Sequence, residues 1–266
     1  MPLRIGFAAT APFGADVLER LAALHDIAFC LTRPDRPAGR GRLLDPPPAK
    51  VTAEELGIPV LQPERLDETV DLPTDTIVTA AYGAIVPSRL LARHLWLNVH
   101  PSLLPRWRGA APVERAIMAG DTETGVTIIK LTEELDAGPI AAQQAFPIEP
   151  DYDAGAVYRR SAEIAVDLLE DVLEEPVFHD QPDDGATYAE KLAAADRALD
   201  LDAQPEESLR RIRALSPHIG ARAELDGRRV TIWQARVEDG KLVPEIVQQD
   251  GRRRVAYDDF LRGLRA

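Results

Sequence analysis

The sequence is poor in cysteine and has no long hydrophobic run. The only cysteine among 266 residues is Cys30. It excludes a disulfide within the chain, and because it lies in an apolar stretch we expect a core residue of a cytoplasmic protein. No stretch reaches the roughly 18 apolar residues of a membrane-spanning helix. The beginning, MPLRIGFAAT, lacks the basic and apolar segments of a signal peptide, so we expect none.

Two common kinds of binding motif are also missing. The spacing of Cys, His and carboxylate residues indicates no metal site. The turn at residues 10–14, TAPFG, is not a G-x-G-x-x-G fingerprint, which argues against a dinucleotide site. The composition is that of an ordinary globular protein, with 45% hydrophobic and 28% charged residues. The length allows one domain and favours two.

Alternating strand and helix patterns predict a Rossmann-like, doubly wound α/β fold with a mostly parallel sheet. Strands are expected at residues 3–9, 27–32, 58–61 and 76–80, and helices at 15–24, 49–56, 87–92 and 153–173. Little periodicity follows the last helix. Short β-type runs resume after residue 205, with a hairpin turn at Asp226-Gly227. We therefore predict a first domain at 1–175, a linker at 176–204 and a second, mainly β domain at 205–266.

A polar pair lies at the end of one predicted strand. Asn98 and His100 are two residues apart, so their side chains share a face, and Pro101 ends the strand. Asp136 follows the next predicted strand, in a turn before Gly138. Each residue alone fits a buried polar side chain or a turn former. Together, an amide, an imidazole and a carboxylate at neighbouring strand ends suit a polar transfer reaction, because they can stabilise an oxyanion and move a proton.

The charge is distributed unevenly. The net charge is -13, but residues 208–266 carry 13 Lys and Arg against 8 Asp and Glu. Residues 33–50 also have a net charge of +3 in an otherwise acidic region, and they are rich in Gly and Pro. Such basic segments indicate contact with an anionic partner, although Arg-rich surfaces are also common without one.

Several ordered motifs resemble the folate-dependent formyltransferases. They are Asn98-x-His100, the stretch SLLPRWRGAAP at 102–112, Leu135-Asp136-x-Gly138, TRPDRPAGRG at 32–41, AYGAIVP at 81–87 and GDTETGVTI at 120–128. The longer stretches are similar to the members that formylate methionyl-tRNA. The resemblance covers nearly the whole chain, and it is dense to about residue 150 and thinner after 205.

The resemblance implies the activity and its residues. The reaction is transfer of a formyl group from 10-formyltetrahydrofolate, with no metal, to the amine of initiator methionyl-tRNA. Asn98, His100 and Asp136 are the implied catalytic residues. Folate is expected to contact Ser102, Leu103, Leu104, Pro105, Tyr82, Gly83, Ile85 and Val86. The tRNA is expected to contact Arg36, Arg40, Arg42, Arg210 and Arg213. The second domain is expected to be a small OB-like β-barrel shortened relative to the family, and the protein a monomer.

Three alternatives stay open. An amino-sugar nucleotide formyltransferase shares the catalytic trio and often a shortened second domain, although the basic loop at 33–50 argues against it. A purine-pathway formyltransferase shares only the trio. An RNA-binding protein without activity has no need for Asn98, His100 and Asp136 together.

Overall fold

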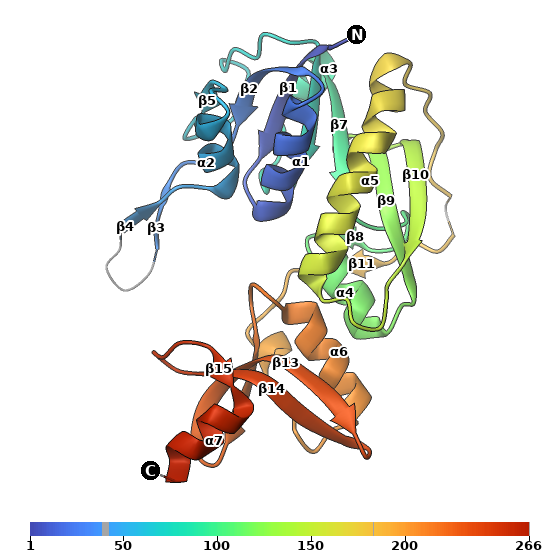
Figure 1. The fold of residues 1–266 in the computed structure, drawn as a ribbon. Helices are drawn as coiled ribbons and strands as arrows, with labels where there is room; N and C mark the ends of the chain where they lie inside the picture. The colour runs from blue at the N-terminus through green and yellow to red at the C-terminus, as the bar shows by residue number, and fades with distance from the viewer. Residues whose placement is uncertain (39–42, 183, 266) are drawn as a thin grey trace. The chain divides into compact units, whose positions relative to one another are not determined.

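The chain forms two compact units. The computed structural model describes residues 1–38, 43–182 and 184–265, and Figure 1 shows its helices and strands. The first unit comprises Met1–Arg108, Gly125–Ala145 and Arg159–Thr187, and the second comprises Gly109–Thr124, Phe146–Tyr158 and Tyr188–Ala266.

The first unit is built on a seven-stranded sheet with the order β10-β9-β7-β6-β1-β2-β5. The strands are β1 (Arg4–Ala9), β2 (Asp26–Leu31), β5 (Val60–Leu61), β6 (Thr76–Ala80), β7 (Leu95–His100), β9 (Glu123–Lys130) and β10 (Ile140–Pro147). The pairs β1–β2, β1–β6, β2–β5 and β6–β7 are parallel, and β7–β9 is antiparallel. The predicted Rossmann-like, mostly parallel sheet is confirmed.

Helices pack on this sheet through apolar faces. They are α1 (Pro12–Ala22), α2 (Pro48–Glu55), α3 (Ser88–Arg93) and the long α5 (Ala154–Glu174). A Cβ atom at Gly14 would lie 2.2 Å from the carbonyl oxygen of Ala80, so only glycine lets α1 approach β6 this closely. His25, just after α1, contacts Glu170 of α5 at 2.6 Å, so these helices lie side by side (Figure 1). In the described part of the chain, no helix is long and apolar enough to cross a membrane.

The sheet interior contains the lone cysteine. Cys30 is fully buried on β2, where it pairs with Phe7 of β1, and its thiol faces the carbonyl oxygen of Ala49 in α2. Burial raises the pKa of its thiol to about 12. The prediction that Cys30 is a core residue is confirmed, and a thiol that stays protonated at neutral pH is not a nucleophile.

Two elements of this region were not expected from the sequence. The basic stretch at 33–50 was predicted as a loop, but it contains a hairpin of β3 (Arg36–Ala38) and β4 (Leu43–Asp45). Strand β10 was missed because its sequence, IAAQQAFP, does not alternate apolar and polar residues. A further short pair joins β8 (Arg108–Gly109) to β11 (Tyr188–Ala189).

The second unit has a four-stranded antiparallel sheet. Its strands are β12 (Ala221–Leu225), β13 (Arg228–Glu238), β14 (Lys241–Gln249) and β15 (Val255–Ala256), paired in that order. The helical elements are α4 (Pro112–Ala119), η1 (Ala195–Arg197), α6 (Pro205–Leu215) and α7 (Tyr257–Arg265). Asp226 and Gly227 both have positive φ, as the predicted hairpin turn requires. This small antiparallel sheet is consistent with the shortened barrel-like domain expected from the sequence.

The core of the second unit joins its helices to its sheet. It is made of Leu199, Ile212, Leu215, Ala221, Val230, Ile232, Val247 and Phe260. The compact units divide the chain differently from the domains expected at 1–175, 176–204 and 205–266. The domain boundaries expected from the sequence stay a prediction, which limited proteolysis can test.

Candidate active site

Strand β7 brings Asn98 and His100 to the carboxyl end of the parallel strands. Asn98 lies between Thr79 of β6 and Ile129 of β9 and is half-buried. His100 is the last residue of the strand and is 4% exposed. Among the described residues, the structure records no hydrogen bond for the Asn98 amide. That amide is therefore available to a ligand, at the sheet edge where ligands bind in open α/β folds.

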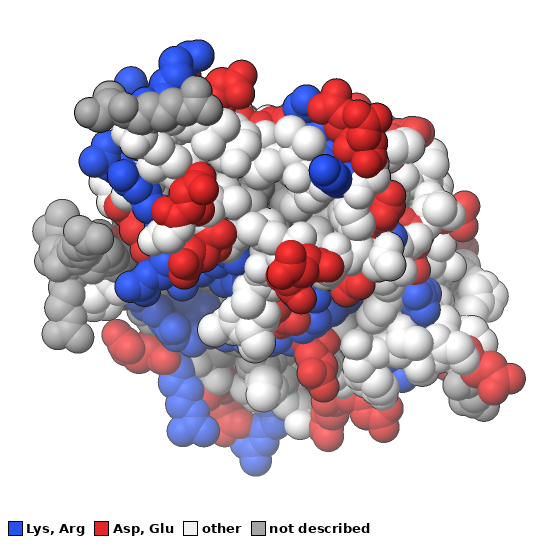
Figure 2. Space-filling model, turned by 90° about the horizontal axis from the view of Figure 1, so that it is seen from below, with Lys and Arg blue, Asp and Glu red and all other residues white. Residues whose placement is uncertain are grey.

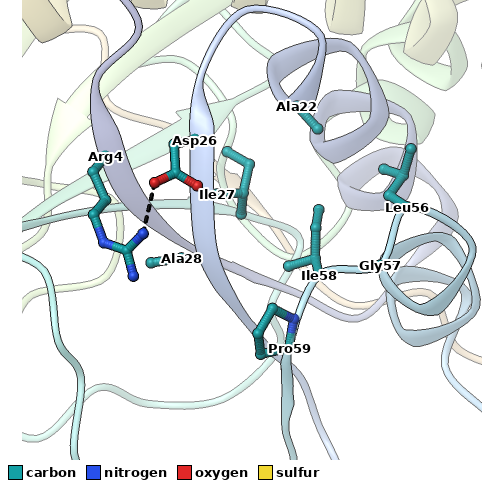
Figure 3. Close-up of a pocket in the computed structure, with 9 residues that line it drawn as sticks. All are labelled: Arg4, Ala22, Asp26, Ile27, Ala28, Leu56, Gly57, Ile58 and Pro59. Atoms are coloured by element: carbon teal, nitrogen blue, oxygen red, sulfur yellow. Dashed lines mark hydrogen bonds and ion pairs between the residues drawn. The ribbon is translucent and has the colours of Figure 1, made fainter.

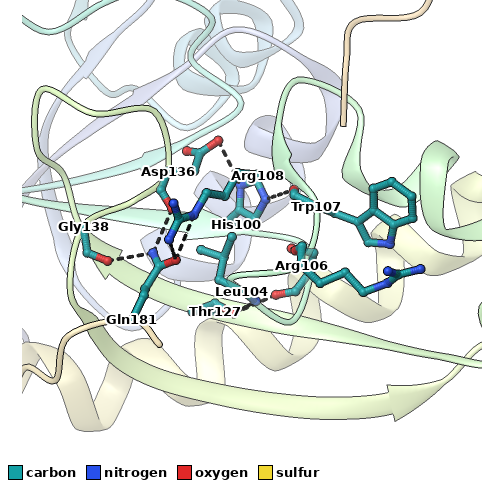
Figure 4. A network of polar contacts seen from close by, with 10 residues as sticks. His100, Leu104, Arg106, Trp107, Arg108, Thr127, Asp136, Gly138 and Gln181 are labelled. Atoms are coloured by element: carbon teal, nitrogen blue, oxygen red, sulfur yellow. Dashed lines mark hydrogen bonds and ion pairs between the residues drawn. The ribbon is translucent and has the colours of Figure 1, made fainter. Parts of the chain in front are cut away.

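The ring of His100 is held by a backbone carbonyl. Its Nε2 atom lies 2.8 Å from the carbonyl oxygen of Trp107, as Figure 4 shows. A carbonyl oxygen only accepts hydrogen bonds, so Nε2 carries the hydrogen. In the neutral ring the lone pair is then on Nδ1. Trp107 has a φ of 65°, a left-handed conformation that is uncommon for a bulky residue, and this conformation directs its carbonyl group to the ring.

Asp136 faces the other ring nitrogen. Its Oδ2 atom lies 3.7 Å from Nδ1 of His100, and both side chains are largely buried. Asp136 occupies the turn after β9 with a φ of 48°. The turn passes tightly against that strand, because a Cβ atom at Gly138 would lie 1.8 Å from the carbonyl oxygen of Lys130. A proton taken up at Nδ1 would thus create a cation directly beside a carboxylate.

The loop after β7 is fixed by buried hydrogen bonds. The hydroxyl of Thr127 donates to the carbonyl oxygen of Ser102 at 2.6 Å and accepts from the backbone N–H of Leu104 at 3.2 Å. The amide of Gln143 also donates to this hydroxyl, at 2.8 Å. The side chain of Ser102 donates to the carbonyl oxygen of Arg106. Ser102 and Leu104 are buried, whereas Leu103 and Pro105 are half-buried.

A second loop, after β6, lies at the same sheet edge. The hydroxyl of Thr10 donates to the carbonyl oxygen of Tyr82, and Arg33 donates to that of Gly83. The side chain of Tyr82 is part of the core, and burial raises its pKa to about 12. Ile85 is 90% exposed. Of the residues expected to contact folate here, Tyr82 can therefore contribute only its backbone, while Ile85 offers an apolar side chain.

The five arginines expected to contact tRNA differ in their surroundings. Arg36 is exposed on β3, and Arg40 and Arg42 lie outside the described residues. Arg213 donates to the carbonyl oxygens of Tyr152 and Glu149, so its guanidinium stabilises the second unit. The stem of Arg210 packs against Gly120. Figure 2 shows Lys and Arg side chains intermingled with Asp and Glu on the face drawn, instead of one continuous basic surface.

The site includes residues that the sequence did not reveal. Trp107 contacts His100 through its backbone carbonyl oxygen, and a backbone contact cannot be recognised from the type of side chain. Thr127 had a weak signal, because it and Thr124 are the two polar residues within the buried run 124–129 of β9. Gln181 and Arg108 join the same network (Figure 4).

A shallow cavity of about 380 Å³ lies elsewhere in the first unit (Figure 3). Arg4 and Asp26, which form a 2.6 Å ion pair in its wall, begin β1 and β2. The cavity is thus at the amino ends of the strands, whereas His100 is at the carboxyl end of β7. Apart from this ion pair, none of the residues that line the cavity has an ionisable side chain.

Comparison with known proteins identifies the family to which the chain belongs. The sequence model named Formyl transferase matches residues 7–173, which is more than half of the chain, and the model named Formyl transferase, C-terminal domain, matches 191–259. The chain belongs to the formyl transferase family. Both expected domains of the family are thus represented in the sequence.

Similar members of the formyl transferase family include two curated enzymes. The methionyl-tRNA formyltransferase of Halorhodospira halophila is 45% identical over 91% of this chain and 82% of its own length. That of Aromatoleum aromaticum is 40% identical over 99% of this chain and 95% of its own. The second alignment spans 299 positions, so the relative contains residues that this 266-residue chain lacks.

Solved structures share the fold at lower identity. The methionyl-tRNA formyltransferase from Clostridium thermocellum has a TM-score of 0.66 at 16% identity, covering 93% of this chain and 98% of that one. WlaRD, described as a sugar 3N-formyl transferase in the presence of dTDP and 5-N-formyl-THF, has a TM-score of 0.67 at 14% identity, covering 95% and 100%. At these identities the likeness establishes the fold alone.

Proposed function

We propose that the protein transfers a formyl group from 10-formyltetrahydrofolate to the amino group of initiator methionyl-tRNA, in the cytoplasm and as a monomer. The observation that carries this proposal is the similarity, at 45% and 40% identity, to curated enzymes of that name. The arrangement of Asn98, His100 and Asp136 at one sheet edge supports it independently, because it supplies the groups that formyl transfer to an amine requires.

The chemistry explains why this trio is suitable. A bond forms between the amine nitrogen and the formyl carbon, the bond from that carbon to the folate nitrogen breaks, and the amine loses a proton. Negative charge develops on the formyl oxygen. We assign the unengaged amide of Asn98 as a donor to this oxygen, since a fixed donor at a developing oxyanion lowers the barrier by about 3 kcal/mol.

His100 is assigned the proton. Its Nε2 atom is engaged by the carbonyl group of Trp107, so Nδ1 is the nitrogen that can receive a proton from the amine. The carboxylate of Asp136, 3.7 Å away, stabilises the resulting imidazolium. In its protonated form the same nitrogen can return the proton to the folate nitrogen that leaves. Nothing in this sequence of steps requires a nucleophilic side chain.

The loops beside the trio fit the folate. The folate supplies the formyl carbon. Residues 102–105 form a loop that Thr127 holds in place, with the half-buried side chains of Leu103 and Pro105, and the loop after β6 offers the backbone of Gly83 and the apolar side chains of Ile85 and Val86. A flat ring system with polar edges binds to such sites, where apolar walls combine with a few fixed polar anchors.

The basic hairpin supports a tRNA as the acceptor. Arg36 is exposed on β3, and the residues between β3 and β4 include Arg40 and Arg42. An exposed arginine such as Arg36, in a segment with a net charge of +3, is suited to phosphate contacts. An amino-sugar nucleotide stays the second candidate, because sugar formyltransferases share the fold, but three such structures are only 14%, 17% and 22% identical to this chain.

One assay tests the proposal. Purified protein is incubated with 10-formyltetrahydrofolate and either charged initiator tRNA or a panel of amino-sugar nucleotides. We expect formylmethionyl-tRNA to form and the sugars to stay unmodified. Formylation of a sugar nucleotide without formylation of the tRNA would contradict the proposal.

A further inference from the structure

Gln181 connects the two loops that hold the catalytic pair. It lies after α5, in the segment expected from the sequence to be a linker, and it is half-buried. Its Nε2 atom donates to the carbonyl oxygens of Asp136 and Gly138, both at 2.8 Å. Its Oε1 atom accepts from Nε and Nη2 of Arg108, at 3.0 and 2.6 Å. Figure 4 shows Gln181 between these partners.

The chemistry of the partners fixes the orientation of this amide. Arg108 can only donate hydrogen bonds, and the two carbonyl oxygens can only accept them. The oxygen of Gln181 must therefore face Arg108 and its nitrogen must face the turn. Both amide hydrogens and both lone pairs are engaged, so no other natural side chain of this length satisfies all four bonds.

The hydrogen-bond partners of Gln181 are next to the groups that contact the two ring nitrogens of His100. Arg108 directly follows Trp107, whose carbonyl oxygen holds Nε2 of His100. The carbonyl group of Asp136 belongs to the residue whose carboxylate faces Nδ1. Because Asp136 has a left-handed backbone conformation, the turn needs external support to keep it.

The neighbouring backbone anchors the segment that carries Gln181. His179 exchanges two backbone hydrogen bonds with Ile140, at 2.7 and 2.9 Å. Thr187 accepts from the backbone N–H of Trp107 through its hydroxyl and from that of Arg108 through its carbonyl oxygen. The segment that carries Gln181 is thus bonded to the first unit at His179 and at Thr187.

We propose that Gln181 is a positioning residue of the formyl transfer reaction, which sets the separation of the His100 ring and the Asp136 carboxylate through Arg108 and the 136–138 turn. The inference rests on the function proposed above. It assigns Gln181 no contact with substrate. Its effect passes through the geometry of the pair, and a displacement of about 1 Å there is sufficient to reduce turnover by up to about 10²-fold.

The test compares Gln181→Met and Gln181→Glu with a matched control, Gln248→Met. Methionine keeps the length of glutamine without its hydrogen bonds, and glutamate keeps the acceptor for Arg108 but places an oxygen against two carbonyl oxygens. Gln248 lies in the second unit. It also donates to a backbone carbonyl, that of Arg252, and accepts from a side-chain N–H, that of Trp233. Its replacement removes bonds of the same kind in a unit that does not contain His100 or Asp136.

We expect both Gln181 variants to lower kcat by about 10-fold or more, with KM for folate and tRNA within about 3-fold of wild type. The pH at which kcat is half-maximal should shift, because the pair that moves the proton is altered. Gln248→Met should keep the wild-type kcat and pH midpoint at a comparable loss of thermal stability. A kcat and pH midpoint in Gln181→Met equal to those of wild type would overturn the proposal.

A measurement without substrate separates this inference from the proposed function. The NMR titration of the His100 ring, identified among five histidines by its absence in His100→Gln, should change in Gln181→Met and stay unchanged in Gln248→Met. If the wild-type protein formylates no tRNA, the function fails while this titration still decides the role of Gln181. An unaltered His100 titration in Gln181→Met contradicts the positioning role.

Discussion

The hydroxyl of Thr127 donates a 2.6 Å hydrogen bond to the carbonyl oxygen of Ser102, and through it β9 fixes the loop that leaves β7. Thr127 is fully buried, and its oxygen also accepts from the N–H of Leu104. One hydroxyl thus makes two of the hydrogen bonds that fix the backbone expected to contact folate.

Replacing Thr127 by Val should destabilise the protein and weaken folate binding together. The substitution keeps the shape but leaves the carbonyl group of Ser102 and the N–H of Leu104 buried without this partner. Such a change costs about 2 kcal/mol of unfolding free energy. Urea denaturation and folate titration measure the two effects. Thr127→Ser, which keeps the hydroxyl, should stay within about 1 kcal/mol of wild type, and an equal destabilisation in both variants would argue against the hydrogen bond as the cause.

Replacing Asn98, His100 or Asp136 by Ala should lower kcat by about 10²-fold or more in each case, with folate binding within a few-fold of wild type. The reason is that these groups are assigned to charge and proton movement in the transition state. Steady-state kinetics and equilibrium binding are compared for each variant. Asp136→Asn is the nearly isosteric control for folding. A variant with near-normal turnover removes that residue from the mechanism.

Glu114 of α4 should make stability depend on pH. It is 9% exposed, it accepts from the hydroxyl of Tyr158 at 3.0 Å, and burial raises its pKa above the ordinary value. The unfolded chain therefore releases this proton at a lower pH than the folded chain does. Glu114 therefore adds most to the unfolding free energy at pH values below the pKa that it has in the unfolded chain. This contribution is lost as the pH rises through the pKa that it has in the folded protein.

Glu114→Gln should flatten this decline in unfolding free energy between acidic and neutral pH. Chemical denaturation at a series of pH values gives the slope, and Glu224→Gln, an exposed position on β12, is the control that should follow the wild type. A wild-type slope in Glu114→Gln would show that the carboxyl group is ionised at little cost in the folded state.

The arginines of the basic hairpin should control binding of tRNA and not the chemical step. Removing one arginine that binds a phosphate should reduce the slope of log affinity against log salt concentration by about one. The double variant Arg40→Ala, Arg42→Ala should raise the tRNA concentration needed for half-maximal formylation. Arg36→Ala should raise it as well. In these variants the slow hydrolysis of the formyl donor without tRNA should proceed at the wild-type rate.

The second pair of candidate arginines provides a contrast. Arg210→Ala should affect tRNA binding more weakly than the hairpin variants. Arg213→Ala should also lower stability, because its guanidinium bonds two backbone carbonyl groups. Wild-type salt dependence in the Arg40/Arg42 double variant would leave the hairpin without a role in binding and favour the amino-sugar acceptor.

Limited proteolysis should cut the chain between about residues 175 and 207, because linkers form few contacts with the folded parts. Within this range, Gln181 and Thr187 are hydrogen-bonded to the first unit, whereas residues 200–202 are exposed. We therefore expect the cuts after residue 189. Mass spectrometry of the fragments locates them, and cleavage confined to residues 1–150 would refute the predicted boundary.

The sequence predicted the sheet and the members of the site because both have local signatures. The runs that became β1, β2 and β6 are mainly apolar, and Asn98-x-His100 marks a strand end by its spacing and by Pro101. Resemblance to a family then related Asp136 to His100 across 36 residues. The structure brings their side chains together, while their catalytic roles remain a prediction.

The parts that could not be predicted depend on backbone atoms and on distant contacts. The carbonyl group of Trp107 selects the hydrogen position on His100, but a carbonyl group is present in every residue. Gln181 acts on Asp136 over 45 positions in the chain, and its surroundings in the sequence resemble a linker. Strand β10 pairs at the edge of the sheet and is half exposed, so no apolar pattern announced it.

The burial of Cys30 has a practical consequence for labelling. Because the only thiol of the chain is enclosed in the core and stays protonated, alkylating reagents should leave the folded protein unmodified. A cysteine introduced at Ile85, which is 90% exposed in the loop after β6, would then be the single reactive thiol. A fluorophore attached there would report arrival of a ligand at this loop, and no other thiol would first have to be removed by mutation.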